Sequence, residues 1–238
     1  MQLHIHPNAK EFLWYNQRFL EKEEVTNGLL LGLALRMAKD VSAQQDALFY
    51  SVRKNARPIF ACIQTATPRY FIFSPAEDGA WQLMLDTLIN KGIPIPGLLG
   101  PRQLVNKAAK YWAAYTGGQT DINMRQLIYR LDMVIPVEEK EGRLRQAQGA
   151  DYPLLKEWVK AFSKESLGEL LTPEEVSELT KRKIEEADLF VWEDKNGAIL
   201  SMAGIARPTT NGMCINYVYT PPAHRKRGLA SSCVASLS

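Results

Sequence analysis

Residues 212–234 read GMCINYVYTPPAHRKRGLASSCV, and they decide the fold. Residues 213–219 have the β-branched and aromatic content of a strand. The two prolines that follow end the ladder because proline lacks a backbone N–H. A short basic segment comes next, and a helical pattern begins at Gly228. Where a strand passes through a tight loop into a helix, the first N–H groups of the helix form an anion site, helped by the helix dipole. We therefore interpret this loop as a phosphate-binding loop.

The side chains of the loop suit a phosphate group. Gly228 and Ala230 carry little or no side chain, so an anion can approach the backbone closely. Arg225, Lys226 and Arg227 add cationic donors beside it. The alternative for three adjacent cations is a solvated basic turn. The small residues in register with the strand–loop–helix order favour the phosphate-binding interpretation.

The spacing Arg225-x-x-Gly228-x-Ala230, after a strand with proline at its exit, resembles the acetyl-CoA-binding motif of the GNAT (Gcn5-related N-acetyltransferase) superfamily. Family members carry Arg or Gln, two residues, Gly, one residue, and then Gly or Ala. The resemblance implies an α/β protein with a mixed sheet, of the acyl-CoA N-acyltransferase fold. It also implies acetyl-CoA as co-substrate, with no metal.

The same resemblance implies which residues bind acetyl-CoA. In the family, the cofactor wedges between the signature strand and the next parallel strand. Backbone groups of residues 218–220 would pair with the pantetheine arm like an added strand. The N–H groups of residues 225–230 would hold the pyrophosphate, and Ser231 and Ser232 are further donors or simple helix caps. The implied cofactor-binding residues are Val218, Tyr219, Thr220, Arg225, Lys226, Arg227, Gly228, Leu229, Ala230 and Ser231.

The sequence leaves the catalytic acid and base unassigned. The family's general base is often a carboxylate on the central strands, which removes a proton from the acceptor amine. Glu193 and Asp194 lie near the end of one expected strand, but we interpret them as exposed turn residues. The family's general acid is commonly a tyrosine after the central helix, where this chain has no residues. Tyr217 and Tyr219 lie on the signature strand, so that role is not transferred to them.

Residues 143–238 follow the element order of this fold through its central helix. We expect a strand at 144–147, a helix capped by Asp151, and a second helix that begins at Thr172 with a capping box to Glu175. A hairpin around residues 194–197 leads to the signature strand. The chain ends at Ser238, so we expect a copy truncated after its central helix. Its uncovered sheet edge would allow self-association.

Residues 1–137 predict the same coarse order. Helices are expected over 8–40, a three-strand meander over 47–73, helices over 77–90 and 101–116, a short strand at 95–99 and a long strand over 122–137. Residues 74–80 stand where the phosphate loop would be, without a basic residue and with an acidic first turn. That charge has the wrong sign for a pyrophosphate. We therefore expect a degenerate N-terminal copy (1–137), a charged linker at 138–142 and a cofactor-binding domain (143–238).

Composition narrows the possible partners. The chain has 238 residues, 46% apolar and 23% charged, with a net charge of +3, which disfavours nucleic acid as a partner. No apolar run reaches membrane-spanning length, and the N-terminus lacks the pattern of a signal peptide. The three cysteines show neither disulfide nor zinc spacing, and His4 and His6 have no ligand partners nearby. These features predict a cytoplasmic protein without membrane or metal.

Two functions of different classes follow. The first is an N-acetyltransferase that moves acetyl from acetyl-CoA to a primary amine of a small molecule or peptide. The alternative is a non-catalytic CoA-binding or protein-interaction module, the chain being an inactive fragment. The sequence does not identify the acceptor.

Overall fold

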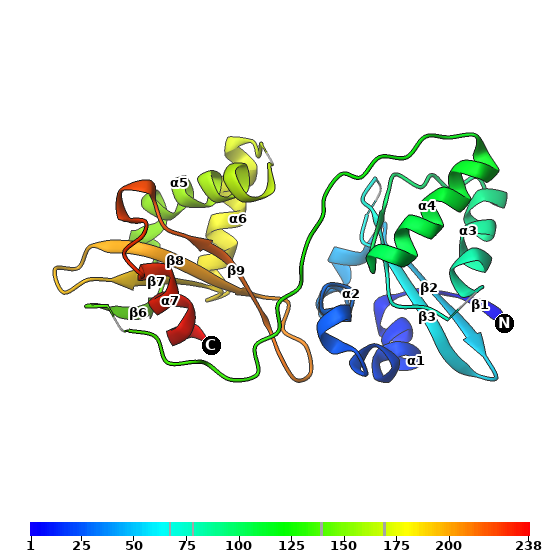
Figure 1. Cartoon of the computed structure of the whole chain (residues 1–238), viewed down its shortest axis with the longest axis horizontal. Coiled ribbons are helices and arrows are strands. Elements are labelled where there is room, and N and C mark those ends of the chain that lie inside the picture. The colour runs from blue at the N-terminus through cyan, green and yellow to red at the C-terminus, as the bar shows by residue number, and fades with distance from the viewer. Residues whose placement is uncertain (67, 78, 139, 169) are drawn as a thin grey trace. The chain divides into compact units, whose positions relative to one another are not determined.

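The computed structural model describes residues 1–66, 68–77, 79–138, 140–168 and 170–238, and it contains two sheets with helices packed on them (Figure 1). Two compact units result: Met1–Arg130 with Arg207–Gly212, and Leu131–Ala206 with Met213–Ser238. The expected domain limits, 1–137 and 143–238, remain a prediction. Asp78 of the expected acidic turn and Glu139 of the expected linker lie outside the described residues.

The first unit has a five-stranded sheet with helices on both faces. Its strands pair in chain order, antiparallel except for the last pair, which is parallel. The strands are β1 (Gln2–His6), β2 (Leu48–Lys54), β3 (Arg57–Gln64), β4 (Phe71–Phe73) and β5 (Leu98–Leu99). The helices are α1 (Ala9–Glu21), α2 (Glu24–Lys39), α3 (Ala80–Asn90) and α4 (Arg102–Thr116), with a 3-10 turn at Val41–Gln44.

Alternation along β3 explains why this sheet is covered twice. Phe60 and Cys62 join a core with Leu85 of α3, whereas Ala61 and Ile63 join another with Leu31 of α2. Successive side chains of a strand point to opposite faces, so a strand that is apolar at every position needs a helix layer on each side.

The second unit has a four-stranded antiparallel sheet, β6 (Arg143–Gln146), β7 (Leu189–Glu193), β8 (Ile199–Ala206) and β9 (Cys214–Tyr219), again paired in chain order. The helices α5 (Tyr152–Phe162) and α6 (Pro173–Glu185) pack with Val191 and Met202 on one face. The helix α7 (Leu229–Leu237) packs with Trp192 and Ala203 on the other. The expected capping box is confirmed: Glu175 N–H donates to Thr172, and Thr172 N–H donates to Glu175.

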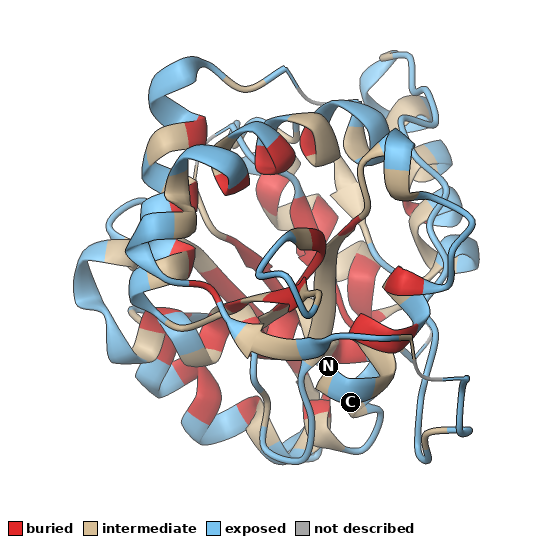
Figure 2. Cartoon of the chain, turned by 90° about the vertical axis from the view of Figure 1, so that its left-hand side faces the viewer, coloured by how far each residue is buried: buried red, intermediate tan, exposed pale blue. Residues whose placement is uncertain are grey.

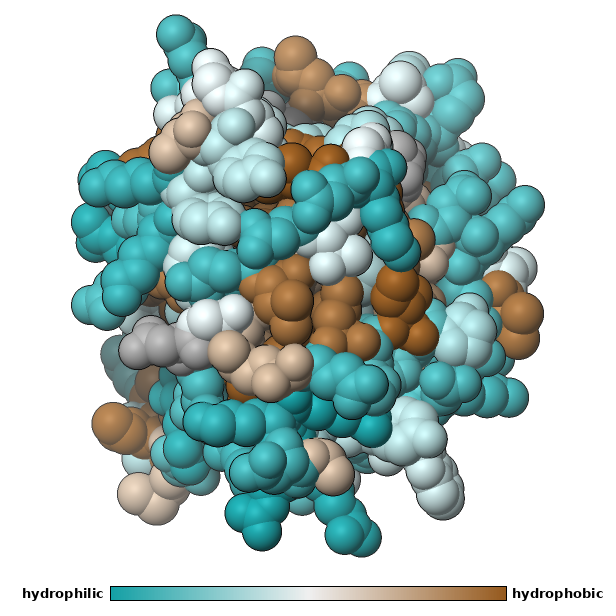
Figure 3. All heavy atoms as spheres, turned by 90° about the vertical axis from the view of Figure 1, so that its right-hand side faces the viewer, coloured by the Kyte–Doolittle hydropathy of each residue, from teal (hydrophilic) through white to brown (hydrophobic). Residues whose placement is uncertain are grey.

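Burial follows the layers. In Figure 2 the buried residues gather on the strands and on the helix faces turned toward them, while the outer helix faces are exposed. In Figure 3 hydrophilic side chains cover most of the visible surface around a hydrophobic patch near its middle. This is the distribution expected when each sheet is sealed by amphipathic helices.

The long strand predicted over 122–137 is wrong. The described residues between 117 and 142 form no helix or strand, and their large apolar side chains except that of Val134 are exposed, with Tyr129 at 86%. An alternating apolar segment forms a strand only when another strand pairs with it. Among the described residues, no strand pairs with this segment. The strand predicted at 95–99 shrinks to β5 for the same reason, and the helix predicted over 77–90 begins at Ala80.

The core of the second unit gives a stability test. Leu155 of α5 is fully buried, whereas its neighbour Leu154 is 40% exposed. Leu155→Ala should lower the free energy of unfolding by about 2–5 kcal/mol, since it removes methyl groups and leaves a cavity. Leu154→Ala should change it by less than about 1 kcal/mol. Urea denaturation followed by circular dichroism measures both, and equal losses would contradict the assigned face of α5.

Candidate functional site

A β-bulge lies in the signature strand. Met202 pairs with Tyr219 and Gly204 pairs with Asn216, so two residues of β9, Tyr217 and Val218, stand opposite the single Ala203 of β8. Tyr217 has φ of +51°, a left-handed conformation that side chains other than glycine rarely adopt. A bulge bends its strand and redirects the backbone groups beside it.

Packing around Tyr217 holds the bulge in place. Its ring lies 4.8 Å from the ring of Phe162 and 4.5 Å from the ammonium of Lys183. On the opposite strand, a Cβ at Gly204 would come within 3.1 Å of both the Asn216 side chain and the Asp188 carbonyl. Glycine at this position therefore lets β8 and β9 approach closely where the register changes.

β9 is the last strand of its sheet, so one of its backbone edges pairs with no other strand in the described part of the chain. Val218 faces the α7 side and Tyr219 the α5 side. Ser201 Oγ donates to the Tyr219 carbonyl at 3.1 Å and contacts Thr220 Oγ1 at 2.8 Å, which ties the strand end to β8. The open edge therefore begins at a bulge and ends at a fixed point.

The loop from β9 to α7 contains two left-handed residues, Lys226 (φ +62°) and Gly228 (φ +79°), after a 3-10 turn at Pro222–His224. Gly228 caps α7 without a side-chain hydrogen bond, and the first bond of the helix runs from Ser232 N–H to the Gly228 carbonyl. The N–H groups of Leu229, Ala230 and Ser231 therefore precede the first intrahelical bond. Leu229 is buried, Ala230 is half-buried, and Ser231 is exposed.

The basic side chains of the loop differ in their partners. Arg225 donates to Glu165 at 2.7 Å and to the Thr220 carbonyl at 2.8 Å, so its guanidinium fastens the loop to the π-helical turn Ser163–Leu167 after α5. Arg227 contacts His224 at 3.3 Å, and Lys226 is exposed. Burial, and then the Glu165 charge, raise the pKa of Tyr219, so its hydroxyl stays protonated and donates to Glu165 at 3.4 Å.

Two residues at this site were missed from the sequence. Glu165 lies 60 positions before Arg225, and no local pattern connects them. Lys140 donates its backbone N–H to Ser232 Oγ at 3.2 Å, and its side chain passes 2.9 Å from where a Cβ of Gly228 would stand. Ser232 is buried with its hydroxyl engaged, which leaves Ser231 as the accessible serine. The Lys140 side chain thus lies beside the loop, and its ammonium forms an ion pair with Glu138 at 2.6 Å.

Glu193 and Asp194 are held in structural roles. Glu193 accepts from Arg143 and Arg145, and its side chain is only 13% exposed, against the exposure expected from the sequence. Hydrogen bonds from Arg145 and then Arg143 lower the pKa of Glu193. Asp194 accepts the N–H groups of Asn196 and Ala198 and so closes its turn. A carboxylate with a lowered pKa and its acceptors occupied is a poor general base.

The buried thiols are not nucleophiles. Burial raises the pKa of Cys233 to about 12 and raises that of Cys62 well above its usual range, so both stay protonated. Acyl transfer through a cysteine thiolate at these two positions is therefore disfavoured. The described residues contain no cluster of three potential metal ligands and no helix long and apolar enough to cross a membrane.

Comparison with known proteins gives the following matches. Neither a protein-family model nor a curated protein matches the chain. The chain is similar to a solved possible acetyltransferase of Clostridium difficile 630 (14% identity, TM-score 0.37, covering 41% of this chain and 69% of that one). It is similar to a solved predicted acetyltransferase with acetyl-CoA from Clostridium acetobutylicum (24% identity, TM-score 0.33, covering 40% of this chain and 70% of that one). It is also similar to a GNAT-family acetyltransferase of Colwellia psychrerythraea (10%, 0.42, covering 98% and 83%). The identities and TM-scores are low, so no residue role or substrate is transferred from these proteins.

The ion-pair network of β6 and β7 predicts a pH dependence. Arg145 bridges Asp151 and Glu193 and lowers the pKa of both carboxyl groups. Stabilisation by these pairs is complete above the unfolded-state pKa values, about 4, and is lost as pH falls through the lower folded-state values. Arg145→Gln should therefore destabilise the protein near neutral pH, and the difference from wild type should shrink at about pH 3. Urea denaturation at both pH values measures this.

Arg143→Gln is the matched control, since the Arg143 side chain is 74% exposed and, among the described residues, pairs with Glu193 but not with Asp151. It should cost less than Arg145→Gln near neutral pH. A loss for Arg145→Gln that is independent of pH would contradict an electrostatic role for this network.

Proposed function

We propose that the chain belongs to the GNAT superfamily and transfers acetyl from acetyl-CoA to a primary amine. The observation that carries the proposal is the bulge at Tyr217 and Val218 on an open strand edge that leads directly into a basic loop and the N-terminus of α7. A bulged open edge offers redirected backbone groups to an extended amide chain, which is the chemistry of pantetheine. The loop offers backbone donors and cations to a pyrophosphate.

The proposed contacts are divided between strand and loop. Backbone groups of Val218, Tyr219 and Thr220 bind the pantetheine arm and polarise the thioester carbonyl. The loop from Arg225 to Ser231 holds the pyrophosphate through its N–H groups, with Lys226 and Arg227 as cationic donors. Arg225 serves the loop by fixing its conformation, because its guanidinium is occupied by Glu165 and Thr220 and its N–H donates to the Pro222 carbonyl at 3.3 Å.

The element order supports a tandem arrangement with a degenerate first copy. Each unit runs strand, two helices, three antiparallel strands and then a helix. In both units, the helix that follows the three strands begins after a left-handed glycine: α3 after Gly79 (φ +84°) and α7 after Gly228 (φ +79°). A residue that precedes the first strand lies 2.9 Å from the Cβ position of each glycine, Met1 in one unit and Lys140 in the other.

The first copy lacks what a cofactor needs. Its β4 pairs with β3 in one register, Cys62 with Phe73 and Ile63 with Ile72, without the extra residue of β9. β4 is paired with the parallel strand β5 at Phe71 and Ile72, so these two strands leave no gap there for a cofactor. The side chain beside its glycine is an apolar Met1, where the second copy has Lys140.

Calorimetric titration of the whole chain with acetyl-CoA tests the proposal. We expect micromolar binding, and Gly228→Glu should weaken it about 100-fold or more, since a carboxylate then faces the pyrophosphate and the left-handed glycine is lost. Gly197→Glu is the matched control, because Gly197 is also left-handed (φ +82°) but lies in the β7–β8 turn. Equal losses in the two variants, or no binding by the folded wild type, would contradict the proposed loop.

The alternative of a non-catalytic CoA-binding module is separated by a thiol-release assay with a panel of amines. Release of free CoA that depends on the amine and is lost in Gly228→Glu supports transfer. Binding without release for any amine supports the binding module.

A further inference from the structure

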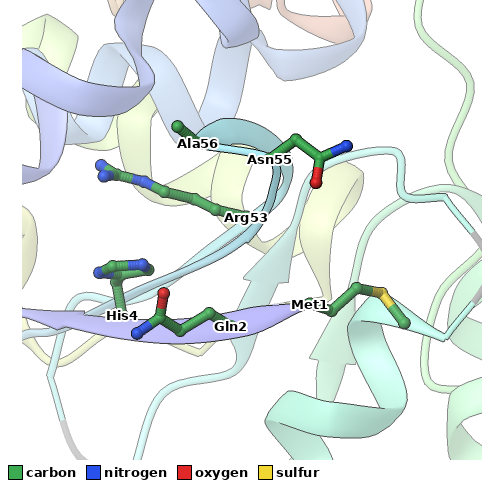
Figure 4. Close-up of a pocket in the computed structure, with 6 residues that line it drawn as sticks. All are labelled: Met1, Gln2, His4, Arg53, Asn55 and Ala56. Atoms are coloured by element: carbon green, nitrogen blue, oxygen red, sulfur yellow. The ribbon is translucent and has the colours of Figure 1, made fainter.

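A surface hollow lies on the first unit, at the end of the ribbon formed by β1 and β2. Figure 4 shows its lining: Met1, Gln2, His4, Arg53, Asn55 and Ala56. Gln2 pairs with Arg53 across the two strands, and His4 lies two residues along β1, so these three side chains share one face of the sheet. In the view of the figure the His4 ring lies below the Arg53 guanidinium.

Arg53 is fixed in position, and two of its guanidinium nitrogens have no acceptor among the described residues. Its guanidinium carbon lies 4.0 Å from the centroid of the Tyr15 ring, a cation–π contact that holds the group in a set plane. The Nε and Nη2 atoms are covered by protein and have no hydrogen-bond partner. Burying an N–H group without an acceptor costs free energy. The planar guanidinium group is suited to bidentate pairing with a carboxylate or a phosphate.

The described residues that line this hollow carry no negative charge. None of the six lining residues is acidic. On the same face of the sheet, Glu11 of α1 is engaged by His6 Nδ1 at 3.4 Å. Glu77 lies 4.0 Å from Lys54, whose side chain points to the opposite face from Arg53. Burial, and then the charge of Arg53, lower the pKa of His4.

In the second unit, the equivalent strand positions hold oppositely charged side chains that neutralise one another. There, Arg143 pairs with Glu193 in the register in which Gln2 pairs with Arg53, and both β2 and β7 change register at that point. Glu193 thus occupies the position of Arg53, with Arg143 and Arg145 at the positions of Gln2 and His4. The second unit therefore places a carboxylate between two arginines, whereas the first unit places Arg53 beside Gln2 and His4.

We propose that the hollow of Gln2, His4 and Arg53 binds a small oxyanion, the carboxylate or phosphate group of a small-molecule ligand. The planar guanidinium fork matches either group, with His4 and the Gln2 amide as further donors. This site is separate from the β9–α7 loop and does not depend on the function proposed for that loop.

The test uses the full chain carrying Gly228→Glu, so that anion binding at the β9–α7 loop is suppressed. Inorganic phosphate and, in a second arm, acetate are titrated while the His4 ring protons are followed by NMR. We expect a saturable shift, and the tighter of the two anions identifies the preferred group. A shift that grows only linearly with both anions would overturn the proposal.

Arg53→Gln should weaken binding at least about 10-fold. Arg57→Gln is the matched control: Arg57 is an exposed arginine of the neighbouring strand β3, and it pairs with Lys54, whose side chain points to the opposite face from Arg53. It should leave the affinity unchanged. If Arg53→Gln fails to fold, Arg53→Lys keeps the charge without the fork and should show intermediate affinity. Equal weakening by the Arg53 and Arg57 variants would mean general charge screening and would overturn the assignment.

Discussion

The extra residue in β9 is the constraint on which the candidate site depends. An edge strand in unbroken register presents an even row of N–H and C=O groups that any other strand could pair with. The bulge interrupts this row at Tyr217 and Val218 and leaves groups directed away from the sheet. Because Tyr217 takes a left-handed φ without glycine's freedom, its surroundings must stabilise that conformation. Phe162 of α5 and Lys183 of α6 do so by packing on the ring.

The ion pair of Glu165 and Arg225 connects the same helices to the loop. The π-helical turn after α5 brings the Glu165 carboxylate to both Arg225 and the Tyr219 hydroxyl. The bulged strand and the loop are therefore held from one side by the same segment of chain. This explains how a loop with two left-handed residues keeps one conformation although most of its side chains are exposed.

Local features of the fold could be predicted from the sequence, and long-range ones could not. The capping box at Thr172, the turn after Asp194 and the helix start at Gly228 are set by residues within a few positions of one another. The bulge depends on how β8 and β9 align, and the contacts of Glu165 and Lys140 bridge 60 and 92 positions. The alternation over 122–137 predicted a strand because a single sequence shows a pattern but not the partner that would pair with it.

The two left-handed glycines show which parts of the motif are structural. Gly79 and Gly228 have nearly the same φ, although only the second stands in a basic loop. The glycine is therefore required by the turn from strand to helix, whether or not a ligand binds there. What differs between the units is the strand before the glycine and the charge around it. β4 is paired on its outer edge and Met1 lies beside Gly79, while β9 is bulged, pairs with no strand on its outer edge among the described residues, and leads into a basic loop. The glycine of the six-residue pattern is thus explained by the fold alone. The proposal of a cofactor rests instead on the bulged strand β9 and the basic loop that follows it.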